Sequence, residues 1–178
     1  MTTLSPFRFL PGLDDYLDAL RTYLPGAEVP VLESVLPSNR AHVDAVLRRV
    51  QGIRAKRIAL LGVAFKPGTD DLRESPMLEL AERLIGKGYE IAIHDEYVNL
   101  DRLIGANREY LEKALPHIAS LLSHDLELTI KGADLVIVAQ ANPAYSRICE
   151  LVPDRPVLDL AGAARPAVAV DNYRGLSW

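Results

Sequence analysis

Cysteine is almost missing from the 178-residue sequence, which contains only Cys149. A single cysteine excludes a disulfide within the chain and is typical of a protein in a reducing compartment. Residues 1–12 have neither a basic stretch nor a sustained apolar stretch, so no secretory signal peptide is expected. The apolar run Ile58–Phe65 is too short to cross a membrane. We therefore expect a cytoplasmic protein without membrane contact.

The sequence also lacks a G-x-G-x-x-G motif, so it has no recognisable primary cradle for a dinucleotide. Positive charge is not in excess, because 20 Lys and Arg stand against 24 Asp and Glu and give a net charge of −4. This balance does not favour nucleic acid as a partner. With 49% hydrophobic and 25% charged residues, the composition is that of an ordinary globular protein.

The most informative stretch is Lys56–Pro76, with the sequence KRIALLGVAFKPGTDDLRESP. Its apolar first part predicts a buried strand, and the Pro and Gly that follow predict a tight loop. Ser75-Pro76 predicts the start of a helix, with Ser75 as the N-cap. Loops at the carboxyl ends of parallel strands bind ligands, and this one carries Lys66 and Arg73 beside a helix N-terminus. The pattern predicts a site for an anion, with phosphate as the favoured group.

Each of these residues also has a purely structural interpretation. Lys66 can be a solvated loop lysine, and Arg73 can pair with a neighbouring carboxylate of Asp70, Asp71 or Glu74. These three acidic residues are more simply explained by turn formation than by metal binding, because no His or Cys lies among them.

The remaining pattern predicts an α/β fold, a Rossmann-like open parallel sheet flanked by helices and preceded by a helical arm. Further strands are expected near residues 89–94, 134–139 and 156–160, with helices near 76–85, 126–131 and 142–151. Residues 13–24 and 29–50 show helical spacing and predict the arm, residues 13–51. Pro37 predicts a kink or a restart in it. The predicted domains are 1–52, the arm, and 53–178, the sheet domain.

Three other residue types are candidates for chemistry, and for each the structural interpretation is favoured. Asp95 follows the second strand, where an acidic residue often binds a ribose, but without a glycine-rich first loop a structural role is preferred. His117 and His124 are too isolated to suggest a metal site. Cys149 is expected to be a small buried hydrophobe rather than a nucleophile.

Residues 62–76, GVAFKPGTDDLRESP, closely resemble the signature that opens the C-terminal domain of nucleotide-sugar dehydrogenases, the UDP-glucose and GDP-mannose dehydrogenases. The resemblance implies that Lys66 contacts the nucleotide sugar and that Arg73 contacts NAD. Residues 105–122 and 157–178 resemble the GDP-mannose branch in particular, which favours a guanosine nucleotide. The resemblance extends over about residues 30–178 and is weak over 7–30.

A complete member of this family also has an N-terminal NAD domain and a middle domain with a catalytic cysteine in a G-S-C-L-P element. The nearest counterpart here, Phe7–Pro11, places Phe9 at the position of that cysteine, and phenylalanine cannot form the covalent intermediate. We therefore expect a nucleotide-sugar-binding domain with no catalytic residue of its own, which uses NAD only if a partner supplies that domain.

Two alternatives remain open. The chain can be the C-terminal part of a split or truncated NAD-dependent dehydrogenase, or an interaction module whose ligand site has decayed. The arm corresponds to the family's dimer-forming middle region, which implies a homodimer through residues 13–51.

Overall fold

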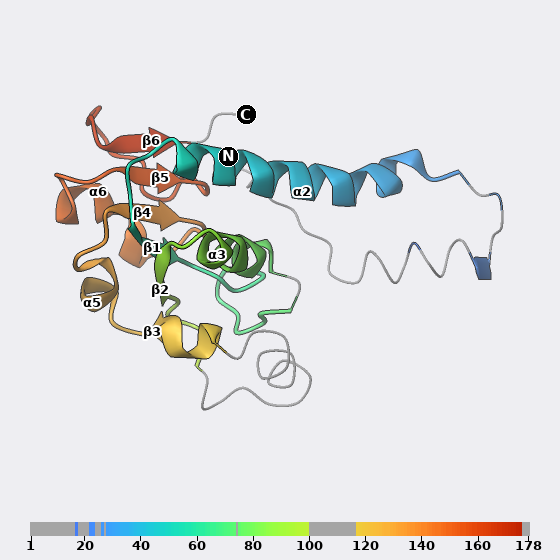
Figure 1. Ribbon diagram of the computed structural model, residues 1–178, viewed down its shortest axis with the longest axis horizontal. Coiled ribbons are helices and arrows are strands. Elements are labelled where there is room, and N and C mark those ends of the chain that lie inside the picture. The colour runs from blue at the N-terminus through green and yellow to red at the C-terminus, as the bar shows by residue number, and fades with distance from the viewer. Residues whose placement is uncertain are drawn as a thin grey trace.

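The structure is a computed structural model that describes residues 28–73, 75–99 and 117–175, together with residues 17, 22, 23 and 26. Within this part of the chain, one sheet of six parallel strands lies at the centre of the fold (Figure 1). The strands are β1 (Arg57–Leu61), β2 (Glu90–His94), β3 (Leu122–Ser123), β4 (Leu135–Val138), β5 (Val157–Asp159) and β6 (Tyr173–Gly175).

The strand order in the sheet is β3-β2-β1-β4-β5-β6. Strands β2 and β3 lie on one side of β1, and β4, β5 and β6 lie on its other side. The direction in which successive strands are added therefore reverses between β1 and β4. In an open parallel sheet this reversal opens a crevice at the carboxyl ends of the strands. The predicted α/β class, a Rossmann-like parallel sheet flanked by helices, is confirmed.

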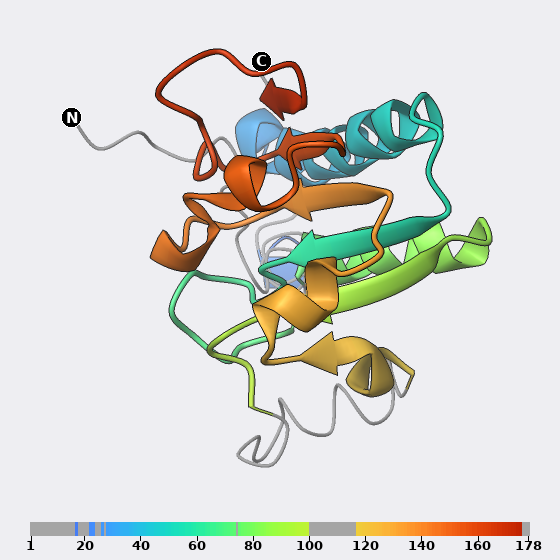
Figure 2. The ribbon, with the colours of Figure 1, turned by 90° about the vertical axis from the view of Figure 1, so that its left-hand side faces the viewer.

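The helices lie on both faces of the sheet (Figure 2). They are α2 (Pro30–Gln51), α3 (Pro76–Gly86), α5 (Leu126–Ile130) and α6 (Ile148–Leu151), with 3-10 helices η2 (Ile118–Leu121) and η3 (Pro143–Tyr145). Alternate residues of a strand point to opposite faces of the sheet, so the central strands contribute side chains to two apolar clusters, one on each face. One contains residues of α2 and α3, and the other contains residues of η3, α5 and α6.

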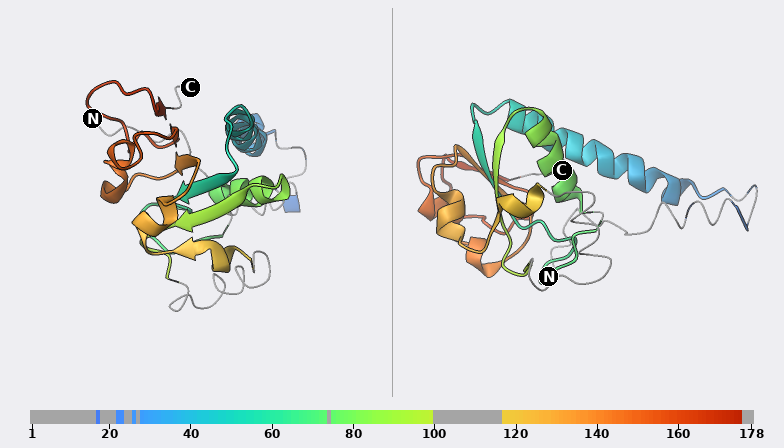
Figure 3. Two further views of the ribbon diagram at one scale, coloured as in Figure 1. Left: turned by 60° about the vertical axis from the view of Figure 1, so that its left-hand side comes forward. Right: turned by 60° about the horizontal axis from the view of Figure 1, so that its bottom comes forward.

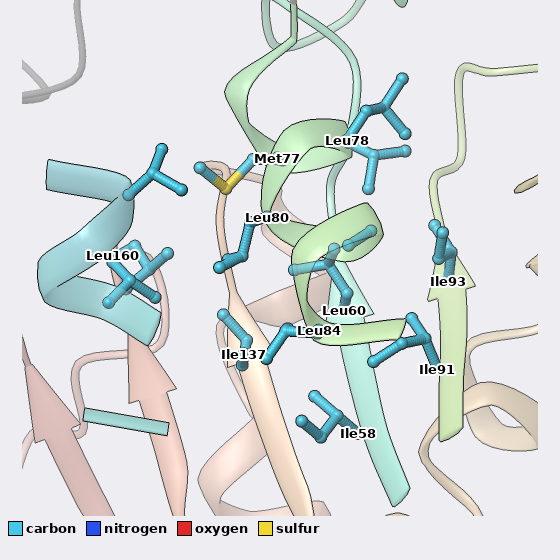
Figure 4. Packing of buried hydrophobic residues seen from close by; sticks show 14 of the residues in the cluster. Ile58, Leu60, Met77, Leu78, Leu80, Leu84, Ile91, Ile93, Ile137 and Leu160 are labelled. Atoms are coloured by element: carbon cyan, nitrogen blue, oxygen red, sulfur yellow. The ribbon is translucent and has the colours of Figure 1, made fainter. Parts of the chain in front are cut away.

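Helix α3 covers the centre of the first face. Its Leu80 and Leu84 lie over Ile58 and Leu60 of β1 and Ile137 of β4 (Figure 4). All five side chains are essentially removed from solvent. Burial of a leucine or isoleucine side chain contributes about 1.5–3 kcal/mol relative to exposure, so this contact fixes α3 on the sheet.

Helix α2 is continuous from Pro30 to Gln51, with Pro37 inside it. The predicted restart at Pro37 is therefore wrong. Proline removes one hydrogen bond to the carbonyl four residues earlier, that of Glu33. Both residues lie on the exposed side of the helix, where water can replace the lost donor. The helix therefore continues through the proline instead of ending there.

The two halves of α2 have different surroundings. Val43, Val46, Leu47 and Val50 are buried in the same cluster as the sheet residues. The N-terminal half extends beyond the sheet (Figures 1 and 3). The domain boundary after residue 52 stays a prediction, although the last half of the arm shares a core with the sheet.

The sequence analysis did not predict two short strands, and it predicted one helix where the structure has two shorter ones. The edge strands β3 and β6 have only two and three residues. The helix expected over 142–151 is instead η3 followed by α6. Most of the expected helix at 13–24, Phe9, residues 100–116 and residues 176–178 lie outside the described residues. No helix among those described is long and apolar enough to cross a bilayer.

Candidate functional site

The candidate site lies at the carboxyl edge of the sheet, where the loops after β1, β2 and β4 meet. These loops are residues 62–75, 95–99 and 139–142. They lie on either side of the reversal between β1 and β4, the position at which open parallel sheets bind ligands. The predicted anion loop therefore lies beside this reversal, at the carboxyl edge of the sheet.

Gly62 starts the loop after β1 and brings it against the loop after β4. Its φ is +85°, and a Cβ at this position would lie 2.7 Å from the Cβ of Gln140. The Gln140 side-chain amide donates to the carbonyl of Ala64, so the two loops are joined by a hydrogen bond. Glycine is required here both for its backbone conformation and for the space.

Asp95 holds the same loop from the side of β2. It is 2% exposed, and its Oδ2 accepts hydrogen bonds from the amides of Val63 at 2.8 Å and Ala64 at 3.0 Å. Its Oδ1 accepts from the amide of Tyr97 at 3.1 Å. The preferred interpretation of Asp95 as a structural residue is confirmed. Because the carboxylate occupies these amides, they cannot bind a dinucleotide phosphate in the usual way.

The far end of the loop is fixed by Ser75. Its hydroxyl donates to the carbonyl of Val63 at 2.6 Å and accepts from the amide of Met77 at 3.3 Å. Ser75 is therefore the N-cap of α3, as predicted, and Pro76 follows at the first helical position. The bond from Ser75 to Val63 joins the two ends of the loop, and the bonds from Val63 and Ala64 to Asp95 hold this junction against the end of β2. The segment between the two ends therefore starts from a fixed base.

Lys66 lies at the tip of this loop, in a tight turn. The carbonyl of Lys66 accepts from the amide and the hydroxyl of Thr69, and Gly68 has a φ of +75°. Proline followed by a glycine with positive φ is typical of a type II turn. The Lys66 side chain is exposed, with its Nζ 5.8 Å from the centre of the Phe65 ring. Its ammonium forms no hydrogen bond or ion pair with any described residue, so its three donors are available to a ligand.

Arg73 is held differently. Its Nε and Nη2 donate to the two carboxylate oxygens of Asp71, at 2.9 Å and 2.8 Å, and its amide donates to Oδ1 at 3.1 Å. These hydrogen bonds hold the pKa of Asp71 below its ordinary value. The structural interpretation of Arg73 as the partner of a neighbouring carboxylate is therefore correct for this conformation. The guanidinium remains half exposed.

A buried polar pair lies below these loops. His94, the last residue of β2, places its Nδ1 2.9 Å from the hydroxyl oxygen of Tyr145. Burial lowers the pKa of His94 and raises the pKa of Tyr145, so both side chains are neutral near pH 7. They support the edge of the sheet and carry no charge for a ligand.

The family model described as "UDP-glucose/GDP-mannose dehydrogenase family, UDP binding domain" matches residues 59–166, which include the whole loop after β1. This chain belongs to that family. The match confirms the recognition made from residues 62–76 and assigns the chain to the family's nucleotide-sugar-binding domain. It does not assign roles to Lys66 and Arg73, which stay predictions.

Relatives of known activity share most of this chain. GDP-mannose 6-dehydrogenase of Pseudomonas putida is 39% identical over 151 residues, which are 84% of this chain and 34% of that protein. UDP-glucose 6-dehydrogenase of Bacillus subtilis is 32% identical over 112 residues, 61% of this chain and 23% of that protein. The chain therefore spans about a third, or less, of the curated relatives that it matches.

Solved structures of the family have the same fold. A ternary complex of GDP-mannose dehydrogenase from Pseudomonas aeruginosa matches with a TM-score of 0.81 and 35% identity, over 96% of this chain and 39% of that one. A UDP-glucose dehydrogenase from Pyrobaculum islandicum matches with a TM-score of 0.66 and 25% identity, over 97% of this chain and 38% of that one.

Two residues of the site were not identified by sequence reasoning as parts of it. Gln140 and Asn142 follow β4, and the Asn142 amide donates to Glu96 at 3.0 Å, which joins the loops after β4 and β2. The signal available was their position, since polar residues directly after a parallel strand lie at the carboxyl edge. Without the strand order, the sequence could not pair them with the loop after β1.

Proposed function

We propose that this domain binds a nucleotide sugar at the carboxyl edge of its sheet, with Lys66 in contact with the anionic part of the ligand. The observation that carries the proposal is the exposed Lys66 ammonium, without a partner among the described residues, on a loop fixed by Asp95 and Ser75. A lysine on a fixed loop is a suitable point charge for phosphate. The membership of the family supports the same ligand class.

A guanosine nucleotide sugar of the GDP-mannose type is the favoured ligand. Several relatives named GDP-mannose 6-dehydrogenase are 38–39% identical over 84–89% of the chain. A UDP-glucose 6-dehydrogenase of Pseudomonas aeruginosa is 38% identical over only 48% of the chain. The resemblance to the GDP-mannose branch thus extends over a larger part of the sequence.

Arg73 is proposed to contact NAD when an NAD domain is present. In the structure the Arg73 guanidinium donates two hydrogen bonds to Asp71 and is half exposed. A phosphate can therefore bind to its exposed side or replace Asp71 as its partner. The chain spans about a third of its curated relatives, so the dehydrogenase reaction for which they are named depends on parts that this chain does not span. We therefore propose a domain that is not catalytic alone. It can act as one part of an NAD-dependent dehydrogenase whose other part is supplied separately.

Isothermal titration calorimetry of the purified chain with GDP-mannose, GDP, UDP-glucose and NAD tests this proposal. We expect saturable binding of GDP-mannose that is tighter than that of UDP-glucose and lost in Lys66→Ala. The matched control is Lys87→Ala, an exposed lysine just after α3 at the opposite edge of the sheet. Equal binding by wild type and Lys66→Ala would contradict the role of Lys66. No heat with any nucleotide would contradict binding by this chain alone and would mean that the site needs its missing partner domain or has decayed.

The arm is proposed to form a homodimer in the cytoplasm. Supporting features are the N-terminal half of α2, which extends beyond the sheet, and Val31, which is 76% exposed on it (Figure 3). Analytical ultracentrifugation is expected to show a dimer that Val31→Asp weakens, while Val168→Asp, an equally exposed valine far along the chain, leaves it unchanged. A clean monomer at high concentration would contradict the proposal.

A further inference from the structure

A cavity lies at the amino edge of the sheet, opposite the candidate site. Its volume is about 790 Å³. It is formed by the last turn of α2 and by the segments that lead into β1, β5 and β6, which converge at one end of the molecule in Figure 1. The lining residues used below are Arg49, Arg54, Arg155, Arg174, Ile53 and Leu158.

Positive charge dominates this cavity. Four arginines line it against two acidic residues, Asp154 and Asp171, although the whole chain has a net charge of −4. Three of the four guanidinium groups, those of Arg49, Arg54 and Arg174, are exposed and form no hydrogen bond or ion pair with any described residue. Their donors are therefore available, in contrast to the paired Arg73 of the first site.

The fourth arginine belongs to the wall of the cavity. Nη1 of Arg155 donates to the carbonyls of Ile130 at 3.0 Å and Ala133 at 3.3 Å, and its Nε lies 3.4 Å from Asp154. On the other side, the Asn172 amide donates to the carbonyls of Cys149 at 3.2 Å and Val152 at 2.9 Å. These bonds to backbone carbonyls fix the two loops on which the cavity is built.

The inner surface of the cavity is apolar. Leu158 is buried, Ile53 and Pro156 are partly buried, and Pro153 completes this surface. A cavity of 300–1,000 Å³ with an apolar surface and a few convergent polar groups is typical of small-molecule sites. The volume exceeds that of a phosphate ion alone, so there is room for an uncharged body beside the anionic group.

We propose that this cavity binds a phosphate-bearing small molecule, with Arg49, Arg54 and Arg174 on the phosphate oxygens and the apolar surface against the body of the ligand. Planar guanidinium groups match the geometry of phosphate oxygens and bind them by two parallel hydrogen bonds. A nucleoside phosphate and a sugar phosphate share this chemistry. The site is separate from the loop with Lys66, because it lies where β1, β5 and β6 begin, whereas that loop follows the carboxyl end of β1.

The test is calorimetry on the Lys66→Ala chain, so that binding at the carboxyl edge does not contribute. The probes are GDP, glucose 1-phosphate and inorganic diphosphate. We expect saturable binding that is roughly tenfold weaker after Arg49→Ala or Arg174→Ala. Arg48→Ala is the matched control, since Arg48 is an exposed arginine next to Arg49 that does not line the cavity. It should leave the affinity unchanged.

The three probes distinguish the sources of the phosphate. Tighter binding of GDP than of diphosphate would uphold the proposal and would mean that a nucleoside lies against the apolar surface. Tighter binding of glucose 1-phosphate than of diphosphate would uphold it and would mean that a sugar lies there. No saturable binding of any probe would overturn it. An equal loss in Arg48→Ala and Arg49→Ala would also overturn it, because the effect would then be general attraction to positive charge.

Discussion

At the scale of residues, buried polar groups determine the shape of the candidate site. Asp95 accepts hydrogen bonds from two amides of the loop after β1, and Ser75 donates to the carbonyl of Val63 in that loop. Gln140 joins the same loop to the loop after β4. A buried donor or acceptor that loses its partner costs about 1–3 kcal/mol, so these contacts hold the loop in one conformation. The backbone that carries Lys66 is therefore held in place, while its side chain extends into solvent.

Gly62→Ala is expected to destabilise the domain by about 1–3 kcal/mol, because alanine is strained at positive φ. Its Cβ would also lie 2.7 Å from the Cβ of Gln140. Gly86→Ala is the control, since Gly86 lies in α3 with nothing within 4 Å and an ordinary φ. Urea unfolding measures both variants. Equal free energies of unfolding for the two would contradict the requirement for glycine at position 62.

Asp71→Asn is expected to lower the free energy of unfolding by about 0.5–1 kcal/mol at pH 7, as is usual for a half-exposed ion pair. The pKa of Asp71 is lowered in the folded state by Arg73, so this stabilisation is present above the ordinary aspartate pKa. It is lost as the pH falls through the folded-state value. Urea unfolding at pH 7 and at about pH 2 should therefore show a difference between variant and wild type only at the higher pH. A difference of the same size at both would disprove the pair's contribution.

At the scale of elements, the sequence predicted those that contain long apolar patterns. The helix expected near 76–85 and the strand expected near 134–139 agree with α3 and β4 within one residue at each end, and the strand expected in the apolar first part of Lys56–Pro76 is β1. The strands β3 and β6 were missed because two or three residues at the edge of a sheet carry no periodicity. The loop was found from its turn residues, whereas Gln140 depends on strand order, which no local pattern encodes.

The unbroken helix α2 yields a prediction at this scale. Pro37→Ala should increase helicity in far-UV circular dichroism and slow amide exchange over residues 30–37, because alanine restores the missing hydrogen bond. The intrinsic preference of a helix interior for alanine over proline is about 3 kcal/mol. Pro30→Ala is the matched control, since proline is favourable at the first helical position. Equal effects of the two substitutions would mean that Pro37 does not weaken the helix.

At the scale of the whole molecule, the sheet separates two regions with different chemistry. The carboxyl edge presents Lys66 on a fixed loop, and the amino edge presents unpaired arginines around a cavity. Helix α2 belongs to the proposed dimer arm and ends at the second region, and its last half shares the core of the sheet.

Removal of residues 1–52 is therefore expected to abolish cooperative unfolding, because Val43, Val46 and Val50 would no longer cover the sheet. Removal of residues 1–27 should leave a cooperative transition, since α2 stays intact. Thermal denaturation followed by circular dichroism distinguishes the two. A cooperative transition without residues 1–52 would instead support a sheet domain that begins at residue 53.

The central claim is that a nucleotide sugar binds to the loop between β1 and α3. Amide NMR spectra of the chain, titrated with GDP-mannose, test it most directly because they locate the ligand on the fold. The account predicts progressive shifts that saturate and cluster at residues 65–73 and 139–142, and that disappear from these residues in Lys66→Ala. Shifts confined to other parts of the domain, or no shifts at saturating ligand, would contradict it.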